Sequence, residues 1–274
     1  MSDNKKKTKI KTPYERVLAA RDPHRAGITD YIEGLFTDFI ELKGDRLGKE
    51  DAAILGGIAL FEGRPVTVIG HRKGKDLEEN LAFNFGMPEP EGYRKALRLM
   101  KQAEKFGRPV ITFIDTPGAY PGKEAEENGQ SNAIAENLRE MSALKIPVIC
   151  FVTGEGNSGG ALAIGVGNKV YMLENAVYCV LSPEGFASIL FKDASKKEEA
   201  SKSMKMTAHE IFEAGLCDGV IDEDSRSRSG LSAVVLENIR SLIRTELSRT
   251  DEMTGEEIAA DRFAKFRQMG RNMV

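Results

Sequence analysis

In three short segments in the middle of this 274-residue chain, proline followed by valine stands at the head of an apolar run. The segments are GRPVTVIG (63–70), GRPVITFID (107–115) and KIPVICFVTG (145–154), and each runs into a glycine-rich or turn-rich stretch. Proline is tolerated as the first residue of a strand, and continuous β-branched runs are typical of strands buried on both faces. The repeat therefore predicts three buried strands, each followed by a loop.

Helical patterns fill the intervals before the second and third segments. The apolar residues that recur there at helical spacing are Tyr93, Ala96, Leu97, Met100 and Ala103, and then Ile134, Leu138 and Met141. An order of strand, loop, helix and strand predicts parallel strands joined by right-handed crossovers, and therefore an α/β fold. In such a sheet the loops at the carboxyl ends of the strands gather on one side, where ligands bind.

Capping signals mark further helices on both sides of this centre. The capping boxes are Thr12 with Glu15, Thr207 with Glu210, and Thr254 with Glu257. A second N-terminal helix is expected to carry an apolar face from Ile28 to Phe39, and Ser182 precedes a proline that opens a helix.

Short strands are expected later in the chain at KVYML (169–173), VYCVL (177–181) and DGVID (218–222). Together these elements divide the chain into an N-terminal helical segment (1–43), a core (44–225) and C-terminal helices (226–274).

Composition and charge exclude several classes of function. The net charge is −3, whereas nucleic-acid-binding proteins usually show a basic excess. The longest apolar run, IPVICFV, is far shorter than the roughly 20 residues of a membrane span. Cys150, Cys179 and Cys217 are widely spaced, which indicates neither a zinc site nor a disulfide framework. The basic N-terminus lacks the apolar region of a signal peptide, so the cytoplasm is the expected location, without membrane or nucleic acid as a partner.

The stretch GEGNSGGALAIGVG (154–167) follows the third strand segment and matches three unrelated signatures. In the first, Gly154, Gly156 and Gly159 have the G-x-G-x-x-G spacing of a dinucleotide-binding turn, and Glu174 lies about 20 residues further on, where an acidic ribose ligand is expected. A dinucleotide fold needs a full-length crossover helix, however, and only GGALAIGV is available before the next strand. This favours a plain glycine-rich turn.

The second signature is the nucleophile elbow G-x-S-x-G, formed by Gly156, Ser158 and Gly160. A hydrolase of this kind needs a histidine and an acid beside the serine, and chain order permits Asp193 and His209. His209 lies in the predicted helix TAHEIFEAG, which favours a surface role. Ser158 is expected to cap the helix that begins at the glycines.

The third interpretation concerns the backbone of Gly159 and Gly160. At the start of a helix these residues would present unpaired N–H groups, which favour negative charge on a ligand oxygen. Such donors are worth roughly 3–4 kcal/mol each when charge develops during a reaction. A second glycine-bearing loop, PGAYPG (117–122), is expected on the same side of the sheet. Two facing backbone loops without an obvious catalytic side chain indicate chemistry driven by oxyanion stabilisation, with the reactive group brought by the substrate.

Six long strings, from about Tyr14 to Asp222, closely resemble the carboxyltransferase alpha subunits of bacterial multi-subunit acetyl-CoA carboxylases. The strings are GDRLGKEDAAILGGIA (44–59), NFGMPEPEGYRKALRLM (84–100), ITFIDTPGAYPG (111–122), GQSNAIAENLREM (129–141), GEGNSGGALAIGVG (154–167) and LSPEGFASILFKD (181–193). The resemblance implies an α/β crotonase-like fold, related to ClpP, in which strand–strand–helix repeats form a spiral with flanking N- and C-terminal helices.

The resemblance also implies a reaction and its partners. The reaction is transfer of the carboxyl group from carboxybiotin, delivered by the biotin carboxyl carrier protein, to acetyl-CoA, giving malonyl-CoA in the first committed step of fatty acid synthesis. The expected partner is a carboxyltransferase beta subunit in an α2β2 assembly, with biotin carboxylase in the holo-complex. No cofactor is expected to be bound covalently, and zinc is expected only on the beta subunit.

In that family the pair matching Gly159 and Gly160 supplies the backbone oxyanion hole for the ureido oxygen of biotin. Arg72 and Lys73 would either meet CoA phosphates or simply be solvated, and no metal ligand is assigned. The residues expected to bind substrate are Gly118, Ala119, Tyr120, Pro121, Ala161, Arg72 and Lys73. One departure from the family pattern lies in this loop, because Asn157 stands where many relatives are expected to have glycine.

Three other functions stay open on the sequence alone. One is a self-sufficient crotonase-fold acyl-CoA hydratase or decarboxylase, which would act without a partner. Another is a serine hydrolase that uses Ser158, and the third is a scaffold without catalytic activity.

Overall fold

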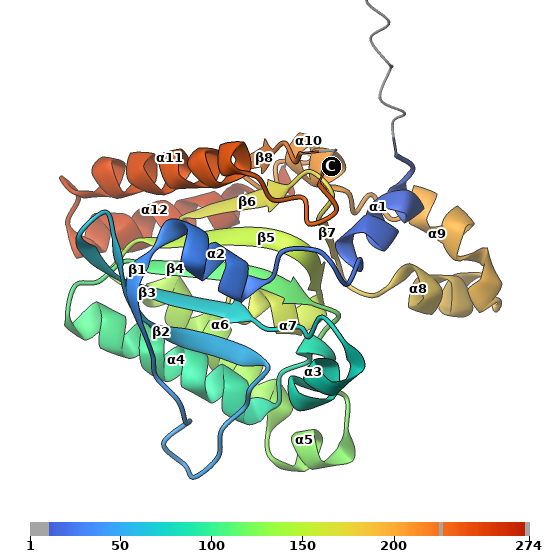
Figure 1. The fold of residues 1–274 in the computed structure, drawn as a ribbon, viewed down its shortest axis with the longest axis horizontal. Coiled ribbons are helices and arrows are strands. Elements are labelled where there is room, and N and C mark those ends of the chain that lie inside the picture. The colour runs from blue at the N-terminus through green and yellow to red at the C-terminus, as the bar shows by residue number, and fades with distance from the viewer. Residues whose placement is uncertain (1–10, 225–226, 272–274) are drawn as a thin grey trace, which may run out of the picture.

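A computed structural model describes residues 11–224 and 227–271, in which helices surround one mixed sheet (Figure 1). The strands are β1 (Thr37–Glu41), β2 (Ile54–Phe61), β3 (Arg64–His71), β4 (Val110–Thr116), β5 (Val148–Asn157), β6 (Lys169–Leu173), β7 (Val177–Cys179) and β8 (Gly219–Ile221). The helices are α1 (Pro13–Ala20), α2 (Ile28–Leu35), α3 (Leu77–Ala82), α4 (Pro90–Lys105), α5 (Lys123–Glu127), α6 (Gln130–Ala143), α7 (Ser158–Leu162), α8 (Pro183–Leu190), α9 (Lys197–Ser203), α10 (Ala208–Glu213), α11 (Ala233–Thr250) and α12 (Gly255–Gln268). Asn84–Gly86 and Ala194–Lys196 form short 3₁₀ turns.

The three segments that begin with Pro-Val form β3, β4 and β5, which are adjacent and parallel as predicted. Val68 lies opposite Ile111, and Ile111 lies opposite Ile149. Proline suits the start of these strands because its carbonyl can still join the ladder. Thr67 N, for example, donates to Pro109 O at 2.9 Å.

The sheet has the order β1-β2-β3-β4-β5-β6-β8, and it is antiparallel only at the β1–β2–β3 edge. Helices α4 and α6 lie side by side over one face, whereas α2 and α11 cover the other (Figure 1). Under α2 the rings of Tyr31, Phe113, Phe151 and Tyr171 stack in a row, with centroids 5.1, 5.5 and 5.6 Å apart. This row joins α2 to β4, β5 and β6 in one core.

Strand β5 pairs with a different strand at each end. Residues 149–152 pair with β6, whereas residues 155–157 pair with β7. The change of partner moves the end of β5, where the glycine-rich segment begins, from β6 to β7, while Gly156 stays opposite Thr116 of β4. The glycine-rich segment emerges at the carboxyl ends of β3, β4 and β5, on the side where α1, α7, α8 and α9 lie (Figure 1).

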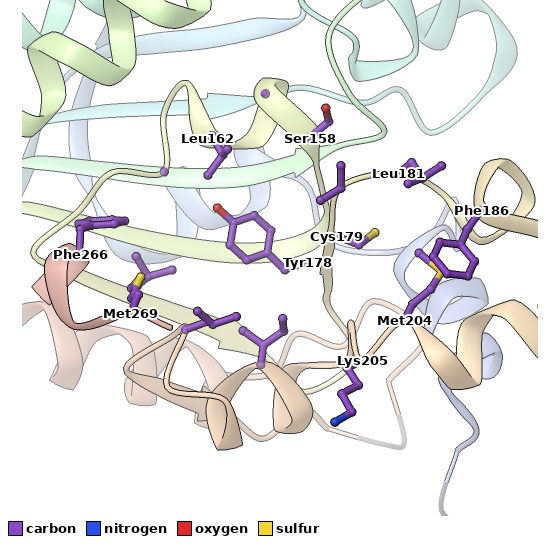
Figure 2. A pocket seen from close by; sticks show the side chains of 16 residues that line it. Ser158, Leu162, Tyr178, Cys179, Leu181, Phe186, Met204, Lys205, Phe266 and Met269 are labelled. Carbon is purple, nitrogen blue, oxygen red and sulfur yellow. The ribbon is translucent and has the colours of Figure 1, made fainter. Parts of the chain in front are cut away.

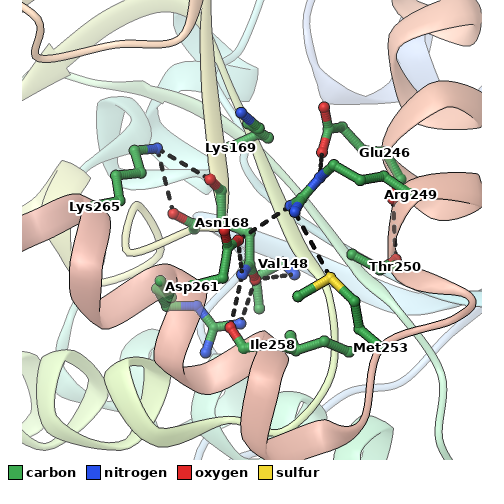
Figure 3. Close-up of polar contacts among 12 residues, drawn as sticks. Val148, Asn168, Lys169, Glu246, Arg249, Thr250, Met253, Ile258, Asp261 and Lys265 are labelled. Carbon is green, nitrogen blue, oxygen red and sulfur yellow. Dashed lines mark hydrogen bonds and ion pairs between the residues drawn. The ribbon is translucent and has the colours of Figure 1, made fainter.

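Helix α12 is anchored to the core by a fully buried arginine. Arg262 donates to the carbonyl oxygens of Met141, Leu144 and Ile146 and to Asn168 Oδ1, at 2.6–3.0 Å. These bonds satisfy carbonyl groups at the end of α6 and just before β5. Burial lowers the pKa of Arg262 to about 10. Figure 3 shows Asn168 at the centre of these contacts, next to the start of β6.

The predicted N-terminal helix is wrong beyond Leu35. Helix α2 ends there, and Phe39 lies in β1, which pairs with β2. Pairing with a strand elsewhere in the chain overrides the local helical spacing. The prediction also contains no strand at β2, the other antiparallel strand of this edge. The division of the chain after residues 43 and 225 stays a prediction, and residues 225 and 226 lie outside the described part.

Other local predictions are confirmed. KVYML forms β6 over the same five residues, and all three capping boxes are present. Ser182 accepts a hydrogen bond from Gly185 N and caps α8. None of the described helices is long and apolar enough to cross a membrane.

Candidate active site

The loops that follow β4 and β5 meet at Gly160, as predicted. A Cβ atom on Gly160 would lie 2.7 Å from Ala119 N and 2.8 Å from the carbonyl carbon of Gly118, closer than side chains approach a backbone. The φ angle of Gly160 is not in the left-handed region. Space, and not backbone conformation, therefore requires glycine at this position.

The N–H groups of Gly159 and Gly160 have no backbone acceptor among the described residues. Helix α7 has only five residues and begins at Ser158, so these N–H groups have no acceptor within the helix. Within the described part of the chain, neither group donates to a backbone carbonyl outside α7. Gly159 is partly exposed, whereas Gly160 is buried.

Ser158 does not cap α7, and this prediction is wrong. The N-cap position belongs to Asn157, and Ser158 is the first helical residue, with a φ of +57°. Residues other than glycine seldom adopt this left-handed conformation, so the turn between β5 and α7 is strained. The Asn157 side chain ties the turn to β7, because its Oδ1 accepts a bond from Cys179 Sγ at 3.0 Å.

The loop after β4 is held by its own polar contacts. Thr116 Oγ1 accepts from Gly118 N at 3.0 Å and donates to Gly118 O at 2.8 Å. Gln130 Nε2 donates to the Tyr120 carbonyl at 2.9 Å. Pro121 is exposed at the far end of the loop. Of residues 118–121, which are expected to bind substrate, Gly118 and Ala119 at the start of the loop lie against α7.

Lys73 lies behind these loops in an ion-pair network. Its Nζ is 2.6 Å from Asp115 Oδ1 and 3.0 Å from Glu155 Oε2, and Arg21, directly after α1, pairs with Glu155 Oε1 at 2.8 Å. Burial by itself would raise the pKa of Glu155, but Lys73 and Arg21 together lower it. The two carboxylates likewise hold the pKa of Lys73 above its ordinary value in spite of burial. The network joins the carboxyl ends of β3, β4 and β5.

Arg72 also has partners within the chain. Its Nε donates to Ala52 O at 3.0 Å, and its guanidinium lies 4.4 Å from the centre of the Phe83 ring. The expectation that Arg72 and Lys73 are merely solvated is therefore corrected, while their contact with CoA phosphates stays a prediction. Ala161, another expected substrate-binding residue, is fully buried in the main core.

An apolar cavity of about 770 Å³ opens beside Gly159, between β7, α7, α8, α10 and α12 (Figure 2). Its walls include Leu162, Tyr178, Phe186 and Phe266. The loop after β4, whose residues 118–121 are expected to bind substrate, does not line this cavity. It packs against α7 at Gly160 instead. An apolar cavity of this size at the end of a parallel sheet is typical of a binding site.

The side chains around Ser158 do not form a hydrolase triad. Asp193 Oδ1 accepts bonds from the N and Oγ of Ser195, and His209 is exposed on α10. The dinucleotide interpretation also lacks its crossover helix, since α7 has only five residues. Over residues 11–224 and 227–271, no group of three or more His, Cys, Asp or Glu side chains is placed to hold a metal ion.

Two side chains near Gly160 have no assigned role in the sequence prediction. Tyr93 is predicted only as an apolar position on a helix, yet its hydroxyl lies 3.0 Å from the point where a Gly160 Cβ would be. His71, the last residue of β3, is also buried, and the Gly160 carbonyl acts on its ring. No sequence signal identifies either residue, because both contacts cross between distant segments.

Sequence comparisons place this chain among carboxyltransferases. The family model described as acetyl co-enzyme A carboxylase carboxyltransferase-like matches residues 2–270. The acetyl-coenzyme A carboxylase carboxyl transferase subunit alpha of Geobacillus kaustophilus is 56% identical over 260 residues, which cover 95% of this chain and 80% of that protein. The protein of the same name from Listeria monocytogenes serotype 4a is 55% identical over 259 residues, covering 94% and 81%.

Solved structures share the fold at lower identity. The transcarboxylase 12S structure aligns with a TM-score of 0.66 and 21% identity, covering 82% of this chain and 42% of that one. The beta subunit of geranyl-CoA carboxylase from P. aeruginosa aligns with a TM-score of 0.66 and 16% identity, covering 93% and 46%. With a crotonase-like fold and a family match over nearly its whole length, the chain belongs to the acetyl co-enzyme A carboxylase carboxyltransferase-like family.

Proposed function

We propose that this chain is the alpha subunit of a carboxyltransferase that moves a carboxyl group from carboxybiotin to acetyl-CoA to form malonyl-CoA. The observation that carries the proposal is the meeting of two glycine loops at Gly160, with the N–H groups of Gly159 and Gly160 left unpaired by the fold. A relative that is 56% identical to this chain has the name acetyl-coenzyme A carboxylase carboxyl transferase subunit alpha, which supports the proposal.

The two N–H groups act on the charge that develops during transfer. Gly159 and Gly160 would hold the ureido oxygen, where negative charge grows as the bond between the biotin nitrogen and the carboxyl carbon breaks. Each such donor is worth roughly 3–4 kcal/mol in the transition state. Carboxybiotin supplies the carboxyl group, and the freed nitrogen supplies the base that takes the methyl proton as the new carbon–carbon bond forms.

The side chains nearest the loops support a reaction without a protein base. Lys73, Asp115 and Glu155 neutralise one another in a single network, so none of them is a free acid or base. His71 has its pKa lowered to about 3, chiefly by burial and also by the Lys73 charge. The chain would thus contribute backbone donors and a shaped surface, with proton transfer left to the substrates.

The proposed partners are a zinc-bearing beta subunit in an α2β2 assembly, the biotin carboxyl carrier protein, and biotin carboxylase in the holo-complex, all in the cytoplasm. The apolar cavity beside Gly159 and the exposed Val180 on its rim are a surface that a partner would cover. We place the beta subunit and its acetyl-CoA on this side of the chain.

The proposal is tested by producing the chain with a zinc-bearing beta subunit and measuring malonyl-CoA-dependent carboxylation of free biotin. Activity is expected only from the complex, and each subunit alone is the control. Turnover of an acyl-CoA by this chain alone would support the self-sufficient hydratase or decarboxylase instead. Failure of the two chains to form a complex would also contradict the proposal.

A further inference from the structure

A buried tyrosine hydroxyl lies against the glycine loops without a hydrogen-bond partner. Tyr93 is completely buried, and its Oη makes no hydrogen bond with any described residue. That oxygen lies 3.0 Å from the position of a Cβ on Gly160, and Ala119 N lies 2.7 Å from the same position. The hydroxyl and the Ala119 amide therefore converge on one side of the Gly160 backbone.

The aromatic ring of Tyr93 is held rigidly at this point. It belongs to the first turn of α4 and packs with Ala133 of α6 and with Ala163, directly after α7. Ala119 and Ile134 pack against the same small cluster. Tyr93 thus touches each of the elements that determine where the two glycine loops lie relative to each other.

A second unpaired polar side chain lies near the same peptide. The His71 ring is 2% exposed, and neither of its nitrogens makes a hydrogen bond to a described residue. The Gly160 carbonyl is the group that favours a proton on this ring, against burial and the Lys73 charge. Unpaired buried polar atoms are rare in folded proteins, and the Tyr93 hydroxyl, beside a peptide that already acts on the His71 ring, calls for an explanation.

Stability does not explain the Tyr93 hydroxyl. A buried hydroxyl without a partner destabilises a fold, and phenylalanine would fill the same cluster without that cost. The Ala119 N–H makes no backbone hydrogen bond outside helices and strands, and both the Ala119 nitrogen and the Tyr93 hydroxyl lie within 3.0 Å of the position of a Cβ on Gly160. The hydroxyl is therefore placed to act on the peptides that form the candidate oxyanion hole.

We infer that Tyr93 is a positioning residue for carboxyl transfer, whose hydroxyl sets the distance and orientation between the Gly160 peptide and the Gly118–Ala119 backbone. The inference rests on the proposed function and deepens it. Tyr93 does not touch substrate, because its Oη is buried. It acts through Gly160, whose N–H must keep its direction while charge develops on the substrate oxygen.

The test compares Tyr93→Phe with a matched control, Tyr31→Phe, in the complex with the beta subunit. Tyr31 is also fully buried, its hydroxyl also lacks a partner among the described residues, and its ring stacks on Phe113 in the main core. Tyr93→Phe is expected to lower kcat for biotin carboxylation about tenfold, with the KM for malonyl-CoA unchanged and the thermal midpoint equal to that of the wild type or higher. Tyr31→Phe is expected to keep the wild-type kcat.

Hydrogen exchange of the peptides that contain residues 117–122 and 157–163 gives a readout that does not depend on activity. Faster exchange in Tyr93→Phe, but not in Tyr31→Phe, is the expected result. Wild-type kcat together with unchanged exchange in Tyr93→Phe, or equal losses in the two variants, would overturn the inference. If the wild-type complex shows no carboxyl transfer, the proposed function fails and the exchange data still decide whether Tyr93 positions the loops.

Discussion

Gly160 and Ala119 approach so closely that a methyl group on Gly160 would begin 2.7 Å from the Ala119 nitrogen. This contact joins the loop after β4 to the start of α7 and leaves no room for a side chain. The candidate site therefore depends on the close approach of two backbone segments. The most direct test is to add one methyl group at this contact, by replacing Gly160 with alanine.

Gly160→Ala is expected to lower carboxyl transfer by the assembled complex at least 100-fold, because the loops must separate and the donor moves. Gly159→Ala is the comparison. There the new Cβ would meet only Ile134 side-chain atoms, at 3.3 and 3.5 Å, so a smaller loss is expected. Gel filtration shows whether each complex assembles. Full activity of assembled Gly160→Ala would support a non-catalytic scaffold.

Ser158→Ala is expected to keep most of the carboxyl-transfer rate, because the proposed donors are backbone groups. Ser158→Gly should in addition raise the thermal midpoint, since glycine relieves the positive φ of +57° at this residue. Rates and melting curves of the two variants are measured side by side. Loss of all turnover in Ser158→Ala would favour the serine hydrolase.

Lys73→Met is expected to destabilise the protein by about 2 kcal/mol, because Asp115 and Glu155 would lose a shared cation in a largely buried position. The control is Arg64→Met, which removes an exposed pair with Asp251 and should cost under about 1 kcal/mol. Urea unfolding measures both. Equal effects would show that the buried network is no more important than a surface pair.

Between pH 7 and pH 5.5, His71 is expected to destabilise the protein as the pH falls. Burial lowers the pKa of His71 from 6.5 to about 3, so the unfolded chain binds one more proton in this range. The His71 contribution to the free energy of unfolding should therefore decrease by about 1 kcal/mol as the pH falls from 7 to 5.5, while Asp51, whose pKa is raised to about 6 by burial, contributes in the opposite direction. Urea unfolding of wild type and His71→Leu at both pH values isolates the contribution of His71 to the pH dependence, which the variant should lack. An identical pH dependence in the two proteins would show that His71 does not cause it.

Arg262→Met is expected to destabilise the protein by about 3 kcal/mol, because four buried oxygen acceptors each lose one hydrogen bond. Arg267→Met, on the exposed side of the same helix, is the control and should have little effect. Thermal and urea unfolding provide the measurement. A stable Arg262→Met protein would mean that packing and the remaining contacts of α12, such as those of Asp261 and Lys265, are enough to anchor it.

The local parts of the fold were predictable from the sequence. The strands headed by Pro-Val, β6 at KVYML and the three capping boxes all follow from preferences that act within a few residues. The meeting of the loops after β4 and β5 was also predictable, since parallel strands bring their carboxyl ends to one edge. Strand β1 was not, because its helical spacing is overridden by pairing with β2.

The sequence by itself determined the three parallel strands headed by Pro-Val, the glycine pair and the family, because each is written in contiguous residues. Only the tertiary structure decided that Lys73 is neutralised by Asp115 and Glu155, that Ser158 has a positive φ, and that Tyr93 lies against Gly160. Such contacts depend on packing between segments far apart in the chain. Local pattern carries no information about which distant group will fill a given space.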